Sequence, residues 1–268
     1  MKYNLSYDIM NKIERYVNNM VNQMKILDAL KKSKIYFEDF ISRSTYHSNA
    51  IEGSTLSFAE TYALLFDNKH SKIEQAEAKE IYEAINHKYA LNKIIDRVES
   101  GKFCMDESFL TEINQIINHN IMYVGGYRMG LIRIRGSEKK FPSPNDLRDI
   151  MNEFYERYNV LFQSKISMKD IAKMHLDYEN IHPYPDGNGR TGRLMINYIL
   201  LSDNQVPIVI PFESRKYYLS LMENNDIDGL AEMFDQLQSK EKERIYDFID
   251  MDQEQSRQHS KYNEDLSR

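Results

Sequence analysis

The sequence has one cysteine, no tryptophan, six prolines and ten glycines in 268 residues. A disulfide or a Cys-x-x-Cys metal site needs two thiols, so the single Cys104 excludes both within this chain. No apolar run approaches the roughly 20 residues that span a bilayer. The N-terminal stretch is also too polar for a signal peptide. We therefore expect a cytoplasmic protein without a membrane-spanning segment.

Acidic residues exceed basic ones, and the net charge is −6. This charge argues against a general nucleic-acid or anionic-membrane surface. Two local patches differ from that average. Residues 128–140 hold five basic side chains and one acidic one, and residues 182–193 hold two arginines among glycines and prolines. Either patch alone is typical of a solvated surface, but the two together indicate a small polyanionic ligand.

Most of the sequence has helical periodicity. Apolar residues three or four apart from Ile9 to Leu27 predict a long amphipathic helix. Ser57, Ser143 and Ser167 are predicted N-caps, each followed three residues later by an acidic residue. The chain from about residue 240 onward is predicted to be a charged helix that ends in a polar, disordered tail.

One stretch, residues 131–142, is typical of strands instead. Apolar and basic residues alternate there before a Gly-Ser pair: Leu131, Ile132, Arg133, Ile134 and Arg135. The fold class that follows is all-α, a helical bundle with one short β-hairpin.

Residues 182–193 read HPYPDGNGRTGR and concentrate three glycines and two prolines in twelve positions. Such a segment cannot continue a helix, and Gly-Asn-Gly tolerates positive φ where the next helix begins. Backbone N–H groups of such a turn, with the positive end of the helix dipole, form an anion site. Arg190 and Arg193 can grip phosphate oxygens, Asp186 suits Mg²⁺, and His182 can take a proton at neutral pH.

A base, a metal ligand, a phosphate cradle and two arginines together indicate phosphoryl or nucleotidyl transfer. The sequence contains no G-x-x-x-x-G-K-[ST] pattern, which argues against a P-loop ATPase. The competing interpretation is a structural turn whose polar residues only satisfy backbone groups. A purely structural turn would explain the Gly-Asn-Gly alone, but it explains the combination of all twelve residues poorly.

The twelve residues resemble the signature of Fic-domain proteins, H-x-F-x-[D/E]-G-N-G-R-x-x-R, with Tyr184 in place of the usual Phe. Flanking segments extend the resemblance over about residues 40–235. It implies the Fic fold, with a hairpin flap, and transfer of AMP from ATP to a hydroxyl of a target protein. His182 would be the general base and Asp186 the Mg²⁺ ligand. The resemblance assigns the nucleotide to Gly187, Asn188, Gly189, Arg190 and Arg193, and the adenine pocket to Tyr218 and Asn225.

A second motif lies in HSNAIEGS. Ser48 and Glu52 are four residues apart and share a helix face, and Gly53 is suited to the position that ends the helix. Alone, this pattern is typical of an ordinary helix end. Beside a Fic signature it resembles the family's inhibitory motif, which implies that Glu52 pairs with Arg193 and displaces the ATP phosphates.

We expect three parts: N-terminal helices over residues 1–60, with the inhibitory helix at about 44–53, a Fic core over 61–235, and a C-terminal helix and tail over 236–268. The resemblance implies a protein target docked on the flap by strand addition. We also expect self-modification and a homo-oligomer, and the net charge predicts no nucleic-acid or membrane partner. Two alternatives remain open. Glu52 could activate water to remove AMP from a protein, or the domain could respond to nucleotides with vestigial catalysis. Donors of UMP or phosphocholine also remain open.

Overall fold

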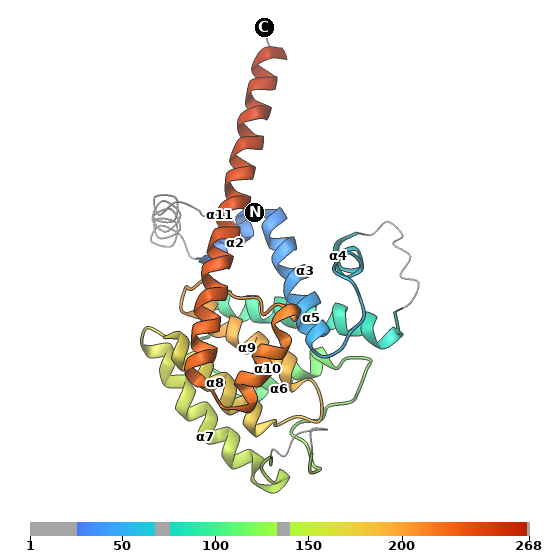
Figure 1. Ribbon diagram of the computed structural model, residues 1–268, viewed down its shortest axis with the longest axis vertical. Helices are drawn as coiled ribbons and strands as arrows, with labels where there is room; N and C mark the ends of the chain where they lie inside the picture. Colours follow the sequence, from blue (N-terminus) through green and yellow to red (C-terminus); the bar gives the residue numbers. More distant parts are fainter. Residues whose placement is uncertain (1–25, 68–75, 133–139, 267–268) are drawn as a thin grey trace.

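The computed structural model describes residues 26–67, 76–132 and 140–266, with side chains as far as residue 248. Every regular element in these ranges is a helix, which confirms the all-α prediction for this part of the chain. The α-helices are α2 (Ile26–Lys32), α3 (Lys34–Ile51), α4 (Phe58–Phe66), α5 (Ala78–Glu99), α6 (Glu107–Ile117), α7 (Leu147–Asn159), α8 (Met168–Ile181), α9 (Asn188–Ser202), α10 (Arg215–Glu223) and α11 (Ile227–Leu266) (Figure 1). Short 3₁₀ turns lie at Pro144–Asp146, Val160–Gln163 and Phe212–Ser214.

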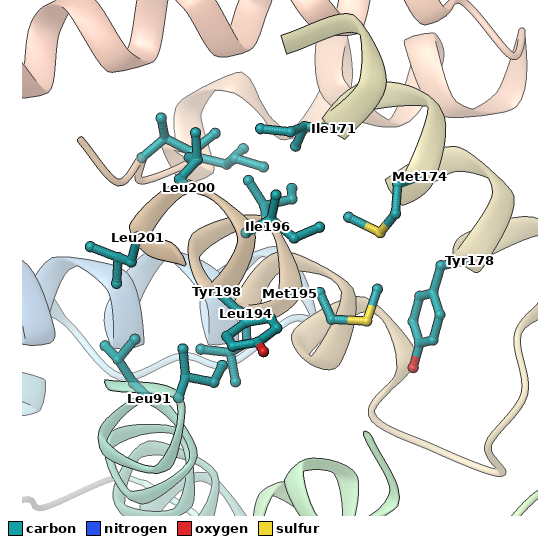
Figure 2. Packing of buried hydrophobic residues seen from close by; sticks show 14 of the residues in the cluster. Leu91, Ile171, Met174, Tyr178, Leu194, Met195, Ile196, Tyr198, Leu200 and Leu201 are labelled. Atoms are coloured by element: carbon teal, nitrogen blue, oxygen red, sulfur yellow. The ribbon is translucent and has the colours of Figure 1, made fainter. Parts of the chain in front are cut away.

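Helix α9 is the centre of the bundle. It packs against α3, α5, α6 and α8, and its side chains are buried on nearly every side. Figure 2 shows Ile196 and Met195 of α9 beside Ile171 and Met174 of α8, with Leu91 of α5 below. From Leu194 to Leu201 the helix is apolar except for Asn197, and a helical segment that is apolar on every side must be enclosed by other helices. The N-terminus of α9 is therefore held rigidly, and that end carries the Gly-Asn-Gly motif.

Two predicted helix starts are confirmed. Ser57 and Glu60 cap each other at the start of α4, where each side chain accepts the other residue's backbone N–H. Ser167 and Asp170 make the same reciprocal pair at the start of α8. The second pair matters for the site, because α8 leads directly into the motif.

The predicted start at Ser143 is displaced. Ser143 Oγ accepts from the N–H of Asn145, only two residues on, so the chain first makes a 3₁₀ turn. Helix α7 begins at Leu147, about one turn later than the N-cap pattern predicts.

Helix α3 is fastened to α11 by a buried cluster of charges. Arg43 donates to both carboxylate oxygens of Glu241, at 2.9 and 2.6 Å, and Tyr36 adds a bond of 2.6 Å to the same carboxylate. Asp39 accepts from Arg43 and from Arg244, at 2.7 and 2.8 Å. Two carboxylates and two guanidiniums thus neutralise one another between the helices, as buried charges must.

The predicted part boundaries fall inside helices. Residue 60 lies in α4, and residue 236 lies in α11, which runs without a break from Ile227 to Leu266 and extends beyond the bundle in Figure 1. Among the helices of the described ranges, none has both the length and the apolar composition to cross a membrane.

Two predicted elements lie mainly outside the described residues. The amphipathic helix predicted from Ile9 is one, although its last apolar position, Leu27, is buried in α2. The hairpin is the other: residues 133–139 are outside, including Arg133, Ile134 and Arg135, and residues 131–132 and 140–142 form no strand.

Candidate active site

His182 lies where α8 ends, in a left-handed conformation with φ 51° and ψ 61°. Few residues other than glycine adopt this conformation, and it needs support from neighbours. Arg128 supplies that support. Its Nε donates to the His182 carbonyl at 2.9 Å, its Nη2 donates to the Pro142 carbonyl at 2.7 Å, and its backbone N–H donates to the Pro183 carbonyl at 2.8 Å. The imidazole is 23% exposed. The charge pattern showed Arg128 only as part of a basic patch, not as this support.

Asn188 closes the loop on itself. Its Oδ1 accepts from the N–H of Tyr184 at 2.9 Å, and its Nδ2 donates to the Tyr184 carbonyl at 2.8 Å. The amide thus fixes the shape of the loop, and the predicted contact of Asn188 with the nucleotide stays a prediction. Tyr184 is fully buried, as expected for an anchor, and its hydroxyl lies 3.1 Å from Thr111 Oγ1.

Asn114 of α6 and Asn118, the residue that caps the end of this helix, support the loop. Asn114 Nδ2 donates to the Asp186 carbonyl at 2.9 Å and to Thr191 Oγ1 at 3.1 Å, and Asn118 Nδ2 reaches the same carbonyl at 3.3 Å. Gly187 has φ 77°, and a Cβ there would lie 2.9 Å from Asn118 Nδ2. Glycine is thus required both by conformation and by space. Sequence analysis missed this pair, whose only signal was two asparagines four residues apart.

Asp186 and Arg190 lie at the start of α9. The Asp186 side chain is 37% exposed, and its Oδ1 accepts from the N–H of Gly187 at 2.6 Å. Arg190 is only 3% exposed and lies 3.1 Å from Glu83 Oε1 and 3.5 Å from Asp186 Oδ1. Its Nε is buried with no hydrogen-bond acceptor among the described residues. A buried guanidinium with an unused donor is suited to an anion.

Arg193 is bound by α3. Its Nε donates to Ser48 Oγ at 3.0 Å, and its Nη2 donates to the Ser48 carbonyl at 2.9 Å and to Glu52 Oε1 at 2.7 Å. The predicted contact between Glu52 and Arg193 is therefore present. Burial alone would raise the pKa of Glu52, but the charge and hydrogen bond of Arg193 outweigh it and hold that pKa below its usual value. The carboxylate also lies against Gly189, where a Cβ would be 2.4 Å from Oε1.

The end of α3 fixes where that carboxylate lies. Gly53 donates to the Ala50 carbonyl and Ser54 to the Asn49 carbonyl, and Gly53 has φ 105°. These are the two bonds of a Schellman motif, with glycine in the position expected from the sequence. Arg215 of α10 donates to the Ile51 carbonyl at 2.7 Å. The last turn of α3 is thus held on the N-terminus of α9.

Tyr218 meets the motif at Arg193, to which its side chain is hydrogen-bonded, and the assignment of Tyr218 and Asn225 to an adenine pocket stays a prediction. Tyr218 is buried in the core, where its hydroxyl lies 2.5 Å from His175 Nε2. Burial, aided by the charge of Arg193, lowers the pKa of His175 to about 3, so this imidazole is neutral. Asn225 is exposed and accepts from Asn180 at 2.8 Å.

The site fits an anionic ligand. Helix N-termini leave backbone N–H groups unpaired and favour negative charge. At α9 the Glu52 carboxylate already occupies that place, beside Gly189 and on Arg193. The protein side chains alone do not form a metal site. Among the described residues, no three His, Cys, Asp or Glu side chains lie close enough together to hold a metal ion. Asp186 would therefore hold Mg²⁺ only together with phosphate oxygens and water, which is how Mg²⁺ commonly binds.

Comparison with known proteins agrees with this geometry. Residues 104–200 match the Fic/DOC family. Protein adenylyltransferase Fic of Nematostella vectensis is 32% identical over 191 residues, which are 68% of this chain and 43% of that protein. Its counterpart in Drosophila willistoni is 29% identical over 206 residues, 74% of this chain and 40% of that protein. This chain thus spans less than half the length of these curated relatives.

Solved structures show the same fold. A Fic domain containing signaling protein from Bacteroides thetaiotaomicron superposes with a TM-score of 0.76, at 23% identity over 89% of this chain and 96% of that one. Fic-1 from C. elegans superposes with a TM-score of 0.71, at 21% identity over 92% of this chain and 74% of that one. The motif over residues 182–193, its place between α8 and α9 and these similarities agree, and the chain belongs to the Fic/DOC family.

Proposed function

We propose that this protein is a protein adenylyltransferase, which transfers AMP from ATP to a hydroxyl side chain of a target protein and is restrained by its own helix α3. One observation carries the proposal. The carboxylate of Glu52 lies on Arg193 and against Gly189, at the helix N-terminus where a nucleotide's phosphates would bind. The relatives at about 30% identity are named protein adenylyltransferases, which supports the same chemistry.

In this mechanism the target hydroxyl attacks the α-phosphorus of ATP, and His182 takes the hydroxyl proton. The bond from the α-phosphorus to pyrophosphate breaks, and pyrophosphate leaves with the displaced electron pair. The N–H groups at the start of α9, with Arg190 and Arg193, stabilise the phosphate charge that builds up. Mg²⁺ held by Asp186 would add charge neutralisation. Asn188 contributes by holding the loop shape through Tyr184.

Inhibition follows from competition between anions. Arg193 cannot give the same donors to Glu52 and to a phosphate, so α3 and a productively bound ATP exclude each other. We also propose that the target docks beside the flap. Next to the undescribed segment 133–139, Met129 and Leu131 are 95% and 81% exposed, and such apolar side chains suit a protein partner.

The test is a transfer assay with ATP labelled at the α-phosphate, scored on the protein itself and on lysate proteins. Glu52→Gly is expected to raise labelling above wild type, and the double variant with His182→Ala to abolish it. ATP labelled at the γ-phosphate is the control and should leave no label. The adenylyltransferase assignment is wrong if Glu52→Gly gives no α-label, or if label from the γ-phosphate persists. Loss of AMP from pre-modified lysate proteins on adding unlabelled wild type would instead favour removal of AMP.

A further inference from the structure

The last turn of α8 places a second acidic residue at the site, which neither the motif nor the mechanism above uses. Glu179 lies three residues before His182, on the same face of the helix end. Its Oε2 is 3.8 Å from His182 Nδ1, and the two side chains are 12% and 23% exposed. This is an ion-pair distance, and it is shielded from water on most sides.

The neighbouring helix leaves room for this carboxylate. Gly192 of α9 faces it, and a Cβ on Gly192 would lie 2.6 Å from Glu179 Oε1 and 2.9 Å from His175 Cε1. The absence of a side chain at residue 192 therefore lets the acid sit between α8 and α9. The negative charge of Glu179 also acts on Arg193 of α9. Burial lowers the pKa of Arg193, but Glu52 and, more weakly, Glu179 raise it.

We propose that Glu179 is a positioning residue for His182, and this inference rests on the proposed function. The carboxylate faces Nδ1 and keeps the proton of the neutral imidazole on that nitrogen, which leaves Nε2 as the base. When the target hydroxyl gives its proton to Nε2, the ring becomes an imidazolium beside an ionised carboxylate. Glu179 stabilises that charge without itself taking a proton. An acid that orients a catalytic histidine acts by the same logic in hydrolytic triads.

The contact is expected to tighten during the reaction. Hydrogen bonds of a catalytic pair are often long before substrate binds and shorten in the reacting complex. The other groups around the pair do not replace the acid. Arg128 donates to the backbone carbonyl of His182 at 2.9 Å, and Arg193 faces Glu179 from α9. Tyr178 and Tyr218 also face Glu179, and burial raises the pKa of both, so they are neutral phenols.

The first test needs no substrate. NMR of the ¹⁵N-labelled full chain follows the imidazole nitrogens of His182 with pH, and the signals are assigned with His182→Ala. A nearby carboxylate raises the pKa of a histidine. The titration midpoint is therefore expected at lower pH in Glu179→Gln than in wild type. Asp177→Asn is the matched control, because it removes an acid of the same helix that pairs with Arg157 and Lys173 instead. It should leave the midpoint in place.

The second test uses AMP transfer in the Glu52→Gly background. Glu179→Gln is expected to lower kcat about 10-fold and to leave KM for ATP within about 2-fold, since general-base catalysis is worth about 10²–10⁴-fold. Equal His182 midpoints in wild type and Glu179→Gln overturn the proposal, whether or not AMP is transferred. A shifted midpoint in a protein that transfers no AMP supports the pairing and removes the proposed function, so the two failures are distinguishable.

Discussion

The strength of the proposed restraint by α3 can be estimated from the contact between Glu52 and Arg193. A hydrogen bond between charged groups contributes about 1.5–3 kcal/mol. The arginine side chain is 8% exposed and the glutamate side chain 40% exposed, so solvent screening places the pair toward the lower part of that range. We take about 2 kcal/mol, which corresponds to about 30-fold in the fraction of molecules that can bind ATP productively.

This estimate predicts a graded series. Glu52→Gly removes both the charge and the hydrogen bond, and is expected to raise the initial rate of AMP transfer about 30-fold at subsaturating ATP. Glu52→Gln keeps an acceptor for Arg193 and loses only the charge. It is expected to give about 5-fold, from about 1 kcal/mol.

The assay is the initial rate of α-phosphate label entering protein, with ATP binding measured separately by calorimetry. Glu38→Gln is the matched control, because Glu38 is another acid of α3 but lies 3.7 Å from Lys34 and not at the site. Its rate should equal that of wild type. Equal rates for wild type and both Glu52 variants would refute the competition. So would an unchanged affinity for ATP in Glu52→Gly, because Arg193, then bound only to Ser48, is expected to turn from α3 toward the phosphate.

Three further predictions concern the supports of the site. Gly187→Ala puts a Cβ 2.9 Å from Asn118 Nδ2 at a residue with left-handed backbone conformation. The free energy of unfolding in urea should fall by about 1–3 kcal/mol. An unchanged unfolding midpoint would contradict the close packing of the loop on α6. Arg43→Met leaves the buried carboxylate of Glu241 without its guanidinium partner. It should lower the free energy of unfolding by about 3–5 kcal/mol in the same measurement. A loss below about 1 kcal/mol would show that Arg43 does not fasten α3 to α11. Burial lowers the pKa of His87 from 6.5 to about 3 in the folded chain. As the pH falls, His87 is therefore protonated in the unfolded chain before it is protonated in the folded one. The stabilisation by neutral His87 is complete above about pH 6.5 and is lost as the pH falls toward 3. The free energy of unfolding then decreases by up to about 1.4 kcal/mol per pH unit. In His87→Asn, urea unfolding at successive pH values should show a flatter decrease. An identical slope in the variant would contradict it.

Features that depend on nearby residues were predictable from the sequence. The capping pairs of α4 and α8 and the glycine that ends α3 appear where the pattern places them, because each is set by contacts within a few residues. The contact between Glu52 and Arg193 spans 141 positions. It was predicted only through the family resemblance, since no local rule joins residues so far apart.

The parts that sequence analysis missed are tertiary. Asn114 supports the loop from 72 positions away, and nothing in its own surroundings marks it. The sequence also did not show that the amide of Asn188 binds the backbone of Tyr184, four residues back. Nor did it show that Tyr218 is buried with its side chain hydrogen-bonded to both His175 and Arg193. A motif records which residue is present, but packing decides which atoms remain available.

The bonding of Arg193 also constrains how the restraint can be released. Helix α3 offers this guanidinium three acceptors: Glu52 Oε1, Ser48 Oγ and the Ser48 carbonyl. Rotation of the Glu52 side chain removes one of them and leaves two, and one of those two is a backbone group that no side-chain motion can move. Arg193 becomes free for phosphate only if it turns away from α3 or if the helix itself shifts. Because α3 is fastened to α11 at Arg43, near its middle, and to Arg215 of α10 at Ile51, its last residue, a shift of the helix must loosen both contacts. Release by a partner or by self-association would therefore act on α10 or α11, at a distance from the phosphate site.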